Sequence, residues 1–324
     1  MTDGIINVNK PAGWTSQDVC SKLRHVLHIR KIGHTGTLDP MATGVLPVCM
    51  GKATRIIEYY DRDSKSYHAS MKLGITTDTL DITGEIVDRG MFSDISEKAV
   101  REAFNDYKGH VMQIPPKYSA IKIDGKRAYD LAREGKSFDI KPREIIVYDN
   151  CITGIDLASG MIEFDITCSK GTYIRTVCDD IGRSLGCGAV MTALARTASG
   201  YFKISDSYTI EEIIEASASA ERNPDGAGAR HRLEEMIIPA DVTLEKLGKI
   251  RLNDNRVTAF LNGNSSWSKG FRITEPSEYD DLYRVYGICD NNASGPAGNG
   301  ANLTFIGVGA VRNGSLVPQK VFNI

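Results

Sequence analysis

The stretch Gly33-His34-Thr35-Gly36-Thr37-Leu38-Asp39-Pro40-Met41-Ala42-Thr43-Gly44-Val45-Leu46-Pro47 lies near the start of this 324-residue chain. Its glycines permit tight turns and the close approach of a ligand. Asp39 precedes a proline, which biases it toward an extended conformation, and the small and then apolar residues that follow allow a buried strand. A lone acid at the edge of an apolar segment can serve as a nucleophile or a base, although Asp-Pro and glycine are also common in ordinary turns.

A strand and a helix are predicted just before this stretch. Residues Asn7 to Trp14 are predicted to form a strand that enters a Pro-Gly turn, and Thr15 or Ser16 then caps a helix. The spacing of its apolar residues predicts a buried face of Val19, Cys20, Leu23 and Leu27.

Two strands and a second helix are predicted after it. The strands cover residues 67–73 and 84–88, and Asp94 with Glu97 forms a capping box at the start of the helix. Gly109 is predicted to end this helix. Its apolar face comprises Ala99, Val100, Ala103, Phe104 and Tyr107.

Alternating residues predict a pair of strands in the middle of the chain. Apolar and polar side chains alternate from Met161 to Ser169, and this strand is predicted to pair with residues 145–157. A helix over residues 175–185 follows, with Gly186 as its terminator. Mixed strands and helices in this order indicate an α+β domain, with a largely antiparallel mixed sheet flanked by helices.

The last third of the chain changes character. Residues Ser217 to Arg232 are rich in alanine, serine and glycine and are predicted to be an exposed or mobile connection. Beyond Leu244 we expect short strands and turns, with 282–289 pairing with 303–311 across the polar segment 290–302. Asn313-Gly314 is a strong hairpin signal before residues 316–322.

Composition excludes several classes of protein. The formal net charge is −2, which argues against binding nucleic acid over the whole surface. The sequence has no apolar run long enough for a membrane span, and its first ten residues do not resemble a signal peptide. The seven cysteines form neither a CxxC pair nor zinc-finger spacing, which favours free thiols in a reducing cytoplasm. We therefore expect a cytoplasmic protein without a metal site.

Several motifs, taken together, resemble those of the TruB family of transfer RNA pseudouridine synthases. The Asp39 stretch is similar to the catalytic motif of that family, and the other motifs follow in family order over roughly the first two hundred residues. They are Asn9-Lys10-Pro11-Ala12-Gly13-Trp14-Thr15-Ser16, Gly51-Lys52-Ala53-Thr54-Arg55, Lys65-Ser66-Tyr67, Leu73-Gly74, Thr77-Asp78-Thr79-Leu80-Asp81, Pro115-Pro116-Lys117-Tyr118-Ser119-Ala120-Ile121-Lys122, Gly125-Lys126, Tyr129 and Lys170-Gly171-Thr172-Tyr173-Ile174-Arg175-Thr176.

The resemblance implies two domains. Residues 1–240 would form the pseudouridine synthase catalytic domain, with an RNA-clamping insertion at about 115–143. Residues 241–324 would form a small, β-rich, PUA-like RNA-binding domain. The implied enzyme acts on the T-loop uridine at position 55 of transfer RNA.

The implied reaction breaks the N1–C1′ bond of uridine, turns the base and rejoins it through C5. It is an isomerisation, so no cofactor is expected. Asp39 resembles the essential aspartate, which would either attack covalently or remove a sugar proton to give a glycal. Arg175 resembles the arginine that pairs with it and keeps it ionised. Tyr67 resembles the active-site tyrosine that stacks on the uracil, although a strand tyrosine can also simply face the core.

Three further residues receive roles from the resemblance. His34 is expected beside the displaced nucleotide in RNA binding or positioning, or is an ordinary loop donor. Lys10 would support the catalytic loop or touch a phosphate. Leu194 would line the pocket or belong to the core.

A local excess of basic residues marks the predicted insertion. From Lys117 to Arg143 eight basic residues are opposed by four acidic ones, and Lys122, Lys126 and Arg127 are the candidate RNA contacts. On spacing alone a solvated helix face is the favoured interpretation; the resemblance reverses this in favour of RNA. A folded stem-loop must release its uridine by base flipping, with recognition mainly of loop shape and unstacked bases.

Three functions remain open at this level. The first is a stand-alone synthase, monomeric and without an obligatory protein partner, whose substrate is the transfer RNA T stem-loop. The second, compatible with it, is a chaperone that refolds the transfer RNA elbow. The third is a guide-RNA-dependent synthase, which the basic insertion disfavours.

Overall fold

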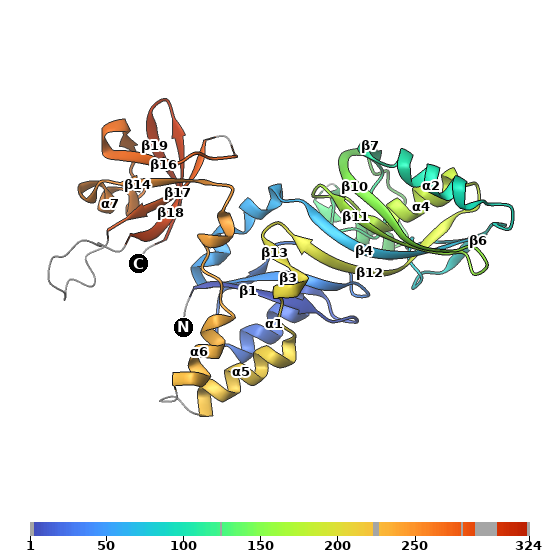
Figure 1. Cartoon of the computed structure of the whole chain (residues 1–324), viewed down its shortest axis with the longest axis horizontal. Coiled ribbons are helices and arrows are strands. Elements are labelled where there is room, and N and C mark those ends of the chain that lie inside the picture. The colour runs from blue at the N-terminus through green and yellow to red at the C-terminus, as the bar shows by residue number, and fades with distance from the viewer. Residues whose placement is uncertain (1–2, 124, 223–226, 280, 289–302, 323–324) are drawn as a thin grey trace.

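The computed structural model describes residues 3–123, 125–222, 227–279, 281–288 and 303–322, and these form two sheets with flanking helices (Figure 1). Within these residues the larger sheet has nine strands in the order β1-β3-β12-β4-β11-β10-β7, with β2 paired to β3 and β13 to β12. Among the described strands of this sheet, every pairing is antiparallel except that of β12 with β3. The predicted α+β fold with a largely antiparallel mixed sheet is confirmed.

The strands of this sheet come from the first two thirds of the chain. They are β1 (Gly4–Lys10), β2 (Ile32–His34), β3 (Thr43–Met50), β4 (Lys65–Leu73), β7 (Gly109–Gln113), β10 (Arg143–Asp156), β11 (Met161–Cys168), β12 (Ala189–Ser199) and β13 (Phe202–Lys203). Two small hairpins lie beside them. They are β5 (Ile75–Thr77) with β6 (Ile86–Arg89), and β8 (Lys122–Ile123) with β9 (Lys126–Arg127).

The first strand and helix confirm the prediction, with shifted strand ends. β1 begins three residues before Asn7 and ends at Lys10 rather than at Trp14. Helix α1 (Ser16–Val26) is capped by Thr15, whose side chain accepts from the Asp18 amide while Asp18 accepts from Thr15 in return. Its four predicted apolar residues are buried. The strand expected after Asp39 is β3. Its apolar residues lie on both faces, because its two faces pack into two different apolar clusters.

Helix α2 (Glu97–Asp106) corrects two details of the prediction. Its N-cap is Ser96, whose hydroxyl accepts from the Ala99 amide, so the capping box of Asp94 with Glu97 is wrong. Asp94 lies too far upstream to reach the first free amides. The helix also ends before Gly109, which instead begins β7 with φ 75°.

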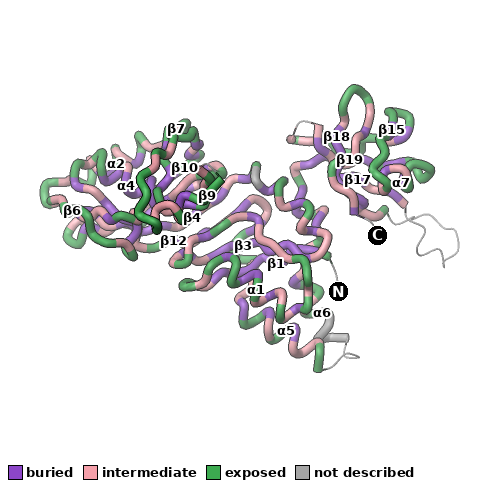
Figure 2. Tube along the Cα trace, turned by 180° about the vertical axis from the view of Figure 1, so that it is seen from behind, coloured by how far each residue is buried: buried purple, intermediate pink, exposed green. Residues whose placement is uncertain are grey.

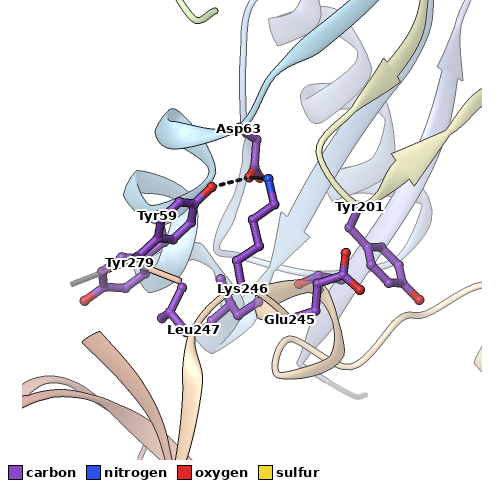
Figure 3. A pocket seen from close by; sticks show the side chains of 9 residues that line it. Tyr59, Asp63, Tyr201, Glu245, Lys246, Leu247 and Tyr279 are labelled. Carbon is purple, nitrogen blue, oxygen red and sulfur yellow. Dashed lines mark hydrogen bonds and ion pairs between the residues drawn. The ribbon is translucent and has the colours of Figure 1, made fainter. Parts of the chain in front are cut away.

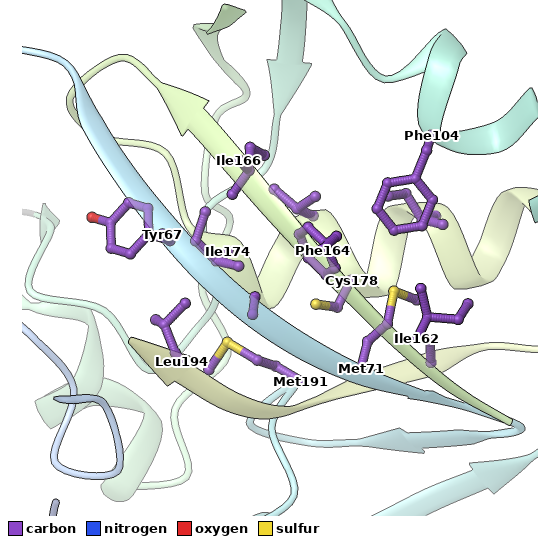
Figure 4. Packing of buried hydrophobic residues seen from close by; sticks show 14 of the residues in the cluster. Tyr67, Met71, Phe104, Ile162, Phe164, Ile166, Ile174, Cys178, Met191 and Leu194 are labelled. Atoms are coloured by element: carbon purple, nitrogen blue, oxygen red, sulfur yellow. The ribbon is translucent and has the colours of Figure 1, made fainter. Parts of the chain in front are cut away.

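The central strand pair and the helix after it are confirmed. β10 pairs with β11 in antiparallel register, and the alternation of β11 places Ile162, Phe164 and Ile166 in the core. Helix α4 (Ile174–Ser184) packs across this face and ends before Gly186, whose φ is 76°. Figure 4 shows the resulting cluster, in which the rings of Phe104 and Phe164 meet edge to face with their centroids 5.0 Å apart. This core supports the strands that carry the site.

The segment from Ser217 to Arg232 is not a connection in its described part, so that prediction is wrong. Helix α5 (Ile210–Arg222) runs through its first residues, and α6 (Ala227–Glu235) follows. Ser217 is buried, and its hydroxyl donates to the Val26 carbonyl of α1 at 3.0 Å. Alanine and serine are small enough for α5 to lie close to α1, and this packing outweighs the loop-like composition.

The C-terminal region forms a second, six-stranded sheet within the described residues, in the order β15-β19-β18-β17-β14-β16. The predicted pairing appears as β17 with β18, and Asn313 and Gly314, both with positive φ, make the predicted hairpin into β19. The β-rich C-terminal domain is thus confirmed. The predicted polar segment 290–302 lies outside the described residues. The elements are β14 (Gly248–Leu252), α7 (Asp254–Leu261), β15 (Ser266–Trp267), β16 (Phe271–Glu275), β17 (Leu282–Gly287), β18 (Thr304–Arg312) and β19 (Ser315–Val321).

The two sheets share a buried apolar cluster. The 3₁₀ segment η1 (Gly51–Arg62) leaves β3 and contributes Ile56 and Tyr60, which pack with Val308 and Phe322 of the second sheet. Figure 2 shows that buried residues run through the strands of both sheets. The remaining described elements are helix α3 (Ala128–Arg133), which follows β9, and the short 3₁₀ segments η2 (Ile204–Asp206), η3 (Val242–Leu244) and η4 (Ser268–Gly270). The boundary at residue 240 stays a prediction.

A polar contact reinforces this junction (Figure 3). The Asp63 carboxylate accepts from the Tyr279 hydroxyl at 3.1 Å and lies 3.5 Å from the Lys246 ammonium. Burial raises the pKa of Asp63, and the nearby Lys246 charge opposes that rise. The lysine and tyrosine therefore satisfy a carboxylate that the apolar junction would otherwise disfavour.

Candidate active site

Asp39 lies in the loop between β2 and β3, and Arg175 lies in the first turn of α4, as the sequence predicted for the helix. The Arg175 Nε atom is 2.9 Å from Asp39 Oδ2, and Nη2 donates to Oδ1 at 3.2 Å. This is a two-point contact in which each carboxylate oxygen has its own nitrogen. The arginine side chain is 6% exposed and that of Asp39 is 35% exposed. The carboxylate is therefore held by a buried arginine on one side and exposed on the other.

The Arg175 guanidinium also donates to backbone carbonyls in other parts of the chain. Arg175 Nη1 donates to the Thr79 carbonyl at 3.1 Å, and Nη2 also donates to the Tyr118 carbonyl at 3.0 Å. A second carboxylate, that of Asp81, lies 3.9 Å from Nε. Arg175 thus ties together the Asp39 loop, the β5–β6 connection and the predicted insertion.

Asp81 is fixed by its own threonines. Its Oδ1 atom accepts from the Thr79 hydroxyl at 3.0 Å and from the amide and hydroxyl of Thr83 at 3.0 and 2.5 Å. The sequence motif that contains Asp81 was recognised, but no role was predicted for this residue. Its signal is the threonine on either side, because both short side chains can bond an intervening carboxylate.

A cavity of about 340 Å³ opens in front of Asp39. Tyr67 of β4 and Leu194 of β12 form an apolar side of it, and both are only 8% exposed. Figure 4 shows the two side chains extending from neighbouring strands of the core cluster. Residues from three other segments complete the lining. They include Thr35, Gly36, Thr37, Leu38, Lys65, Ser119, Ala120, Ser169, Lys170, Gly171, Thr172, Tyr173 and Ile174.

Arg196 was missed by the sequence interpretation. It pairs across the strands with Tyr67 and is 1% exposed, with Nε donating to the Val45 carbonyl at 2.6 Å and Nη2 to the Gly36 carbonyl at 3.2 Å. Burial raises the pKa of Tyr67, and the Arg196 charge opposes that rise. The available signal was its place two residues after Leu194, which puts both side chains on one face of β12.

Lys10 contacts the Asp39 loop from within the protein and is fully buried. Its ammonium group donates to the carbonyls of Pro11 at 2.8 Å, Trp14 at 2.7 Å and Pro40 at 3.2 Å. Burial lowers the pKa of Lys10 from 10.5 to about 8, while the Asp39 charge acts in the opposite direction. All three protons are used within the protein, which is the geometry of a support for the Asp39 loop.

His34 and the three candidate basic residues of the insertion are not among the residues that line the cavity. His34 ends β2, and its Nδ1 atom is buried without a hydrogen-bond partner among the described residues. Burial, with a contribution from Arg196, lowers its pKa. Lys122, Lys126 and Arg127 are exposed on the β8–β9 hairpin, where Arg127 donates to the Tyr129 hydroxyl at 3.0 Å. Their contact with RNA stays a prediction.

The described residues contain no cluster of three or more histidine, cysteine, aspartate or glutamate side chains arranged to hold a metal ion. Nor is any helix in the described ranges both long and apolar enough to cross a membrane.

Comparisons with known proteins identify this arrangement. Residues 24–174 match the family model described as "TruB family pseudouridylate synthase (N terminal domain)", and residues 175–245 match "tRNA pseudouridylate synthase B C-terminal domain". A protein of Clostridium kluyveri named tRNA pseudouridine synthase B is 41% identical, covering 88% of this chain and 91% of its own length. One of the same name from Alkaliphilus oremlandii is 42% identical, covering 82% and 83%.

A solved structure has the same fold. It is entitled "Crystal Structure of a Cbf5-Nop10-Gar1 Complex", and its matching chain is 25% identical with a TM-score of 0.73, covering 99% of this chain and 85% of that one. Fold, site and likeness together define the class as a pseudouridylate synthase. More particularly, the chain belongs to the TruB family.

Proposed function

We propose that this protein isomerises uridine 55 in the T loop of transfer RNA to pseudouridine. The observation that carries the proposal is the Asp39 carboxylate, gripped by Arg175 at two points and open toward a cavity of about 340 Å³. Relatives about 40% identical are named tRNA pseudouridine synthase B, which supports transfer RNA as the substrate.

Asp39 is the proposed catalytic carboxylate. Both a covalent attack on the nucleotide and the removal of a sugar proton require a carboxylate that faces the substrate. Arg175 fixes the direction in which the carboxylate faces, because its other donors are anchored on the carbonyls of Thr79 and Tyr118. Both chemical routes to N1–C1′ cleavage are compatible with this geometry.

Tyr67 and Leu194 are the proposed walls for the flipped base. Unstacking a base costs a few kcal/mol, and contact with an aromatic ring and an apolar side chain can offset that cost. The base must stay in place after N1–C1′ cleavage, turn, and bond C1′ through C5, where a proton leaves. Two buried side chains on adjacent strands form a rigid surface for that rotation.

The basic insertion is the proposed clamp on the rest of the stem-loop. Its first residues contact the active site directly, because the Tyr118 carbonyl accepts from Arg175 at 3.0 Å. Its exposed Lys122, Lys126 and Arg127 carry the charge that RNA phosphates require. This excess of positive charge on the chain itself supports a stand-alone enzyme that needs no guide RNA or protein partner.

Tritium release from a T-arm stem-loop carrying 5-tritiated uridine tests the proposal. The purified protein alone should release tritium, and Asp39→Asn should release none while it still binds the RNA. Asp149→Asn, an exposed substitution on β10, is a matched control and should keep the wild-type rate. Tight RNA binding without release by the wild-type protein would refute the proposed reaction, and undiminished release by Asp39→Asn would refute the proposed role of Asp39.

A further inference from the structure

A second cavity, of about 350 Å³, lies at the end of β3 that is remote from Asp39. Four cationic residues and one acidic residue line it, together with Ile29, Gly51 and Thr54. The charged residues are Arg30, Lys31, Lys52, Arg55 and Asp3. The whole chain carries a formal net charge of −2, so this lining is a strong local excess of positive charge.

The acidic residue is already engaged. Asp3 Oδ1 accepts from the Lys52 amide at 2.9 Å, and Oδ2 lies 3.6 Å from the Lys52 ammonium. The negative charge of Asp3 is therefore engaged with Lys52 in the first turn of η1. The described lining contains no second carboxylate for the other three cations. The nearest acid on η1, Glu58, lies 2.9 Å from Lys320.

The cations differ in how firmly they are held. Arg55 donates through Nη1 to the Val321 carbonyl of β19, so it links the cavity to the C-terminal sheet. For Arg30 and Lys31, both exposed, the structure records no side-chain hydrogen bond or ion pair within the residues that it describes. These two side chains are the ones available to a ligand.

We infer that this cavity binds backbone phosphates of the RNA substrate, outside the nucleotide that enters the active site. This inference rests on the proposed function. β3 begins four residues after Asp39 and has eight residues, so at about 3.3 Å per residue its ends are roughly 23 Å apart. A single flipped nucleotide cannot span that distance, so a different stretch of the RNA occupies the cavity.

The chemistry of the lining favours a polyanion over a single bound ion. The first two amides of η1 are already engaged, that of Gly51 by the Lys31 carbonyl and that of Lys52 by Asp3, so long side chains rather than backbone groups supply the positive charge. Exposed lysine and arginine bind successive phosphates through charge, without reading the base sequence. The junction with the C-terminal sheet then becomes part of the RNA-binding surface.

The test compares full-length transfer RNA with an isolated T-arm stem-loop. Arg30→Ala/Lys31→Ala should raise the Kd for full-length transfer RNA by about tenfold at moderate salt, and the slope of log K against log salt should fall by about two, one per phosphate contact. The loss on the T-arm stem-loop should be clearly smaller. Arg30→Gln/Lys31→Gln, which keeps the stems of the side chains, should give the same pattern and separates charge from packing.

A matched control removes the same charge elsewhere. Lys98→Ala/Arg101→Ala lies on α2, far from the C-terminal sheet (Figure 1), and should leave Kd and salt slope unchanged for both RNAs. Unchanged Kd and slope in both cavity variants would overturn the inference, while tritium release by the wild-type protein would still uphold the proposed function. Equal losses on the two RNAs would place the bound phosphates within the T arm and would still support the inference. An effect confined to inorganic phosphate binding, measured as a thermal shift, would overturn it.

Discussion

Arg175 and Asp39 are separated by 136 residues in sequence, yet the arginine meets both oxygens of the carboxylate, at 2.9 and 3.2 Å. One partner belongs to a loop between two strands and the other to the start of a helix. The same guanidinium reaches two backbone carbonyls and approaches Asp81. The orientation of the proposed catalytic group therefore depends on the packing of three distant segments.

Arg175→Lys should lower tritium release about a hundredfold or more and also reduce stability. Lysine keeps the charge but cannot match the planar fork that serves Asp39, Thr79 and Tyr118 at once. Each buried carbonyl left without a donor costs about 1–3 kcal/mol. Single-turnover release and thermal unfolding measure the two effects. Arg183→Lys on the same helix is the control, and an equal loss in that variant would contradict the assignment.

Asp81→Asn should lower the rate of release about tenfold while RNA affinity changes little. The amide oxygen can still accept from Thr79 and Thr83, but the negative charge near Arg175 is lost. The arginine is then balanced by Asp39 alone, which alters how strongly it holds the catalytic carboxylate. Kinetics at saturating RNA measure the effect, and Asp88→Asn, exposed on β6, is the control. Wild-type release by Asp81→Asn would show that its charge has no part in catalysis.

Tyr67→Phe should abolish most release, by about 10²- to 10⁴-fold, if the hydroxyl takes part in proton transfer at C5. The ring remains to stack on the base, so RNA affinity should stay within about threefold of wild type. Tyr148→Phe, on an exposed position of β10, should behave as wild type. A Tyr67→Phe enzyme with full activity would limit Tyr67 to packing.

Lys10 should make stability depend on pH. Its pKa is about 8 in the folded protein against 10.5 ordinarily, so the unfolded chain binds more protons between these values. The contribution of Lys10 to the free energy of unfolding should therefore rise with pH from 8 to 10.5, by up to about 1.4 kcal/mol per pH unit. Below pH 8 it should be flat.

The comparison with Lys10→Met isolates this effect. Chemical denaturation at pH 7, 8, 9 and 10 should show the wild-type protein gaining stability relative to Lys10→Met as the pH increases above 8. Lys22→Met, a substitution on α1, should show no such divergence. A constant difference between wild type and Lys10→Met across this range would contradict the burial of a destabilised ammonium group.

Local patterns predicted much of the fold. The alternation of β11, the Thr15 cap of α1 and the Asn313-Gly314 hairpin are all present, because each depends on residues a few positions apart. The α5 helix was missed because alanine and serine are ambiguous alone. The helix there depends on the close packing of this segment against α1, which includes the hydrogen bond from the Ser217 hydroxyl to the Val26 carbonyl.

The candidate site was likewise predicted in part from the sequence. Motifs pointed to Asp39, Tyr67 and Arg175, the family resemblance pointed to Leu194, and the structure gathers these four around one cavity. Arg196 and Asp81 were missed, because their local signals, the spacing from Leu194 and the flanking threonines, do not show the distant partners that each residue contacts. The support role of Lys10 likewise became visible only with the Pro40 carbonyl in place.

The sequence by itself determined the family, the class of chemistry and most of the helices and strands, since motif identity and short-range periodicity are local properties of the chain. The tertiary structure alone decided which donors hold Asp39, where the cavity opens, and how Arg30, Lys31 and Arg55 come to line a second one. Distances between charges depend on how strands pair and helices pack over the whole sheet, and these contacts join residues that the linear pattern leaves far apart.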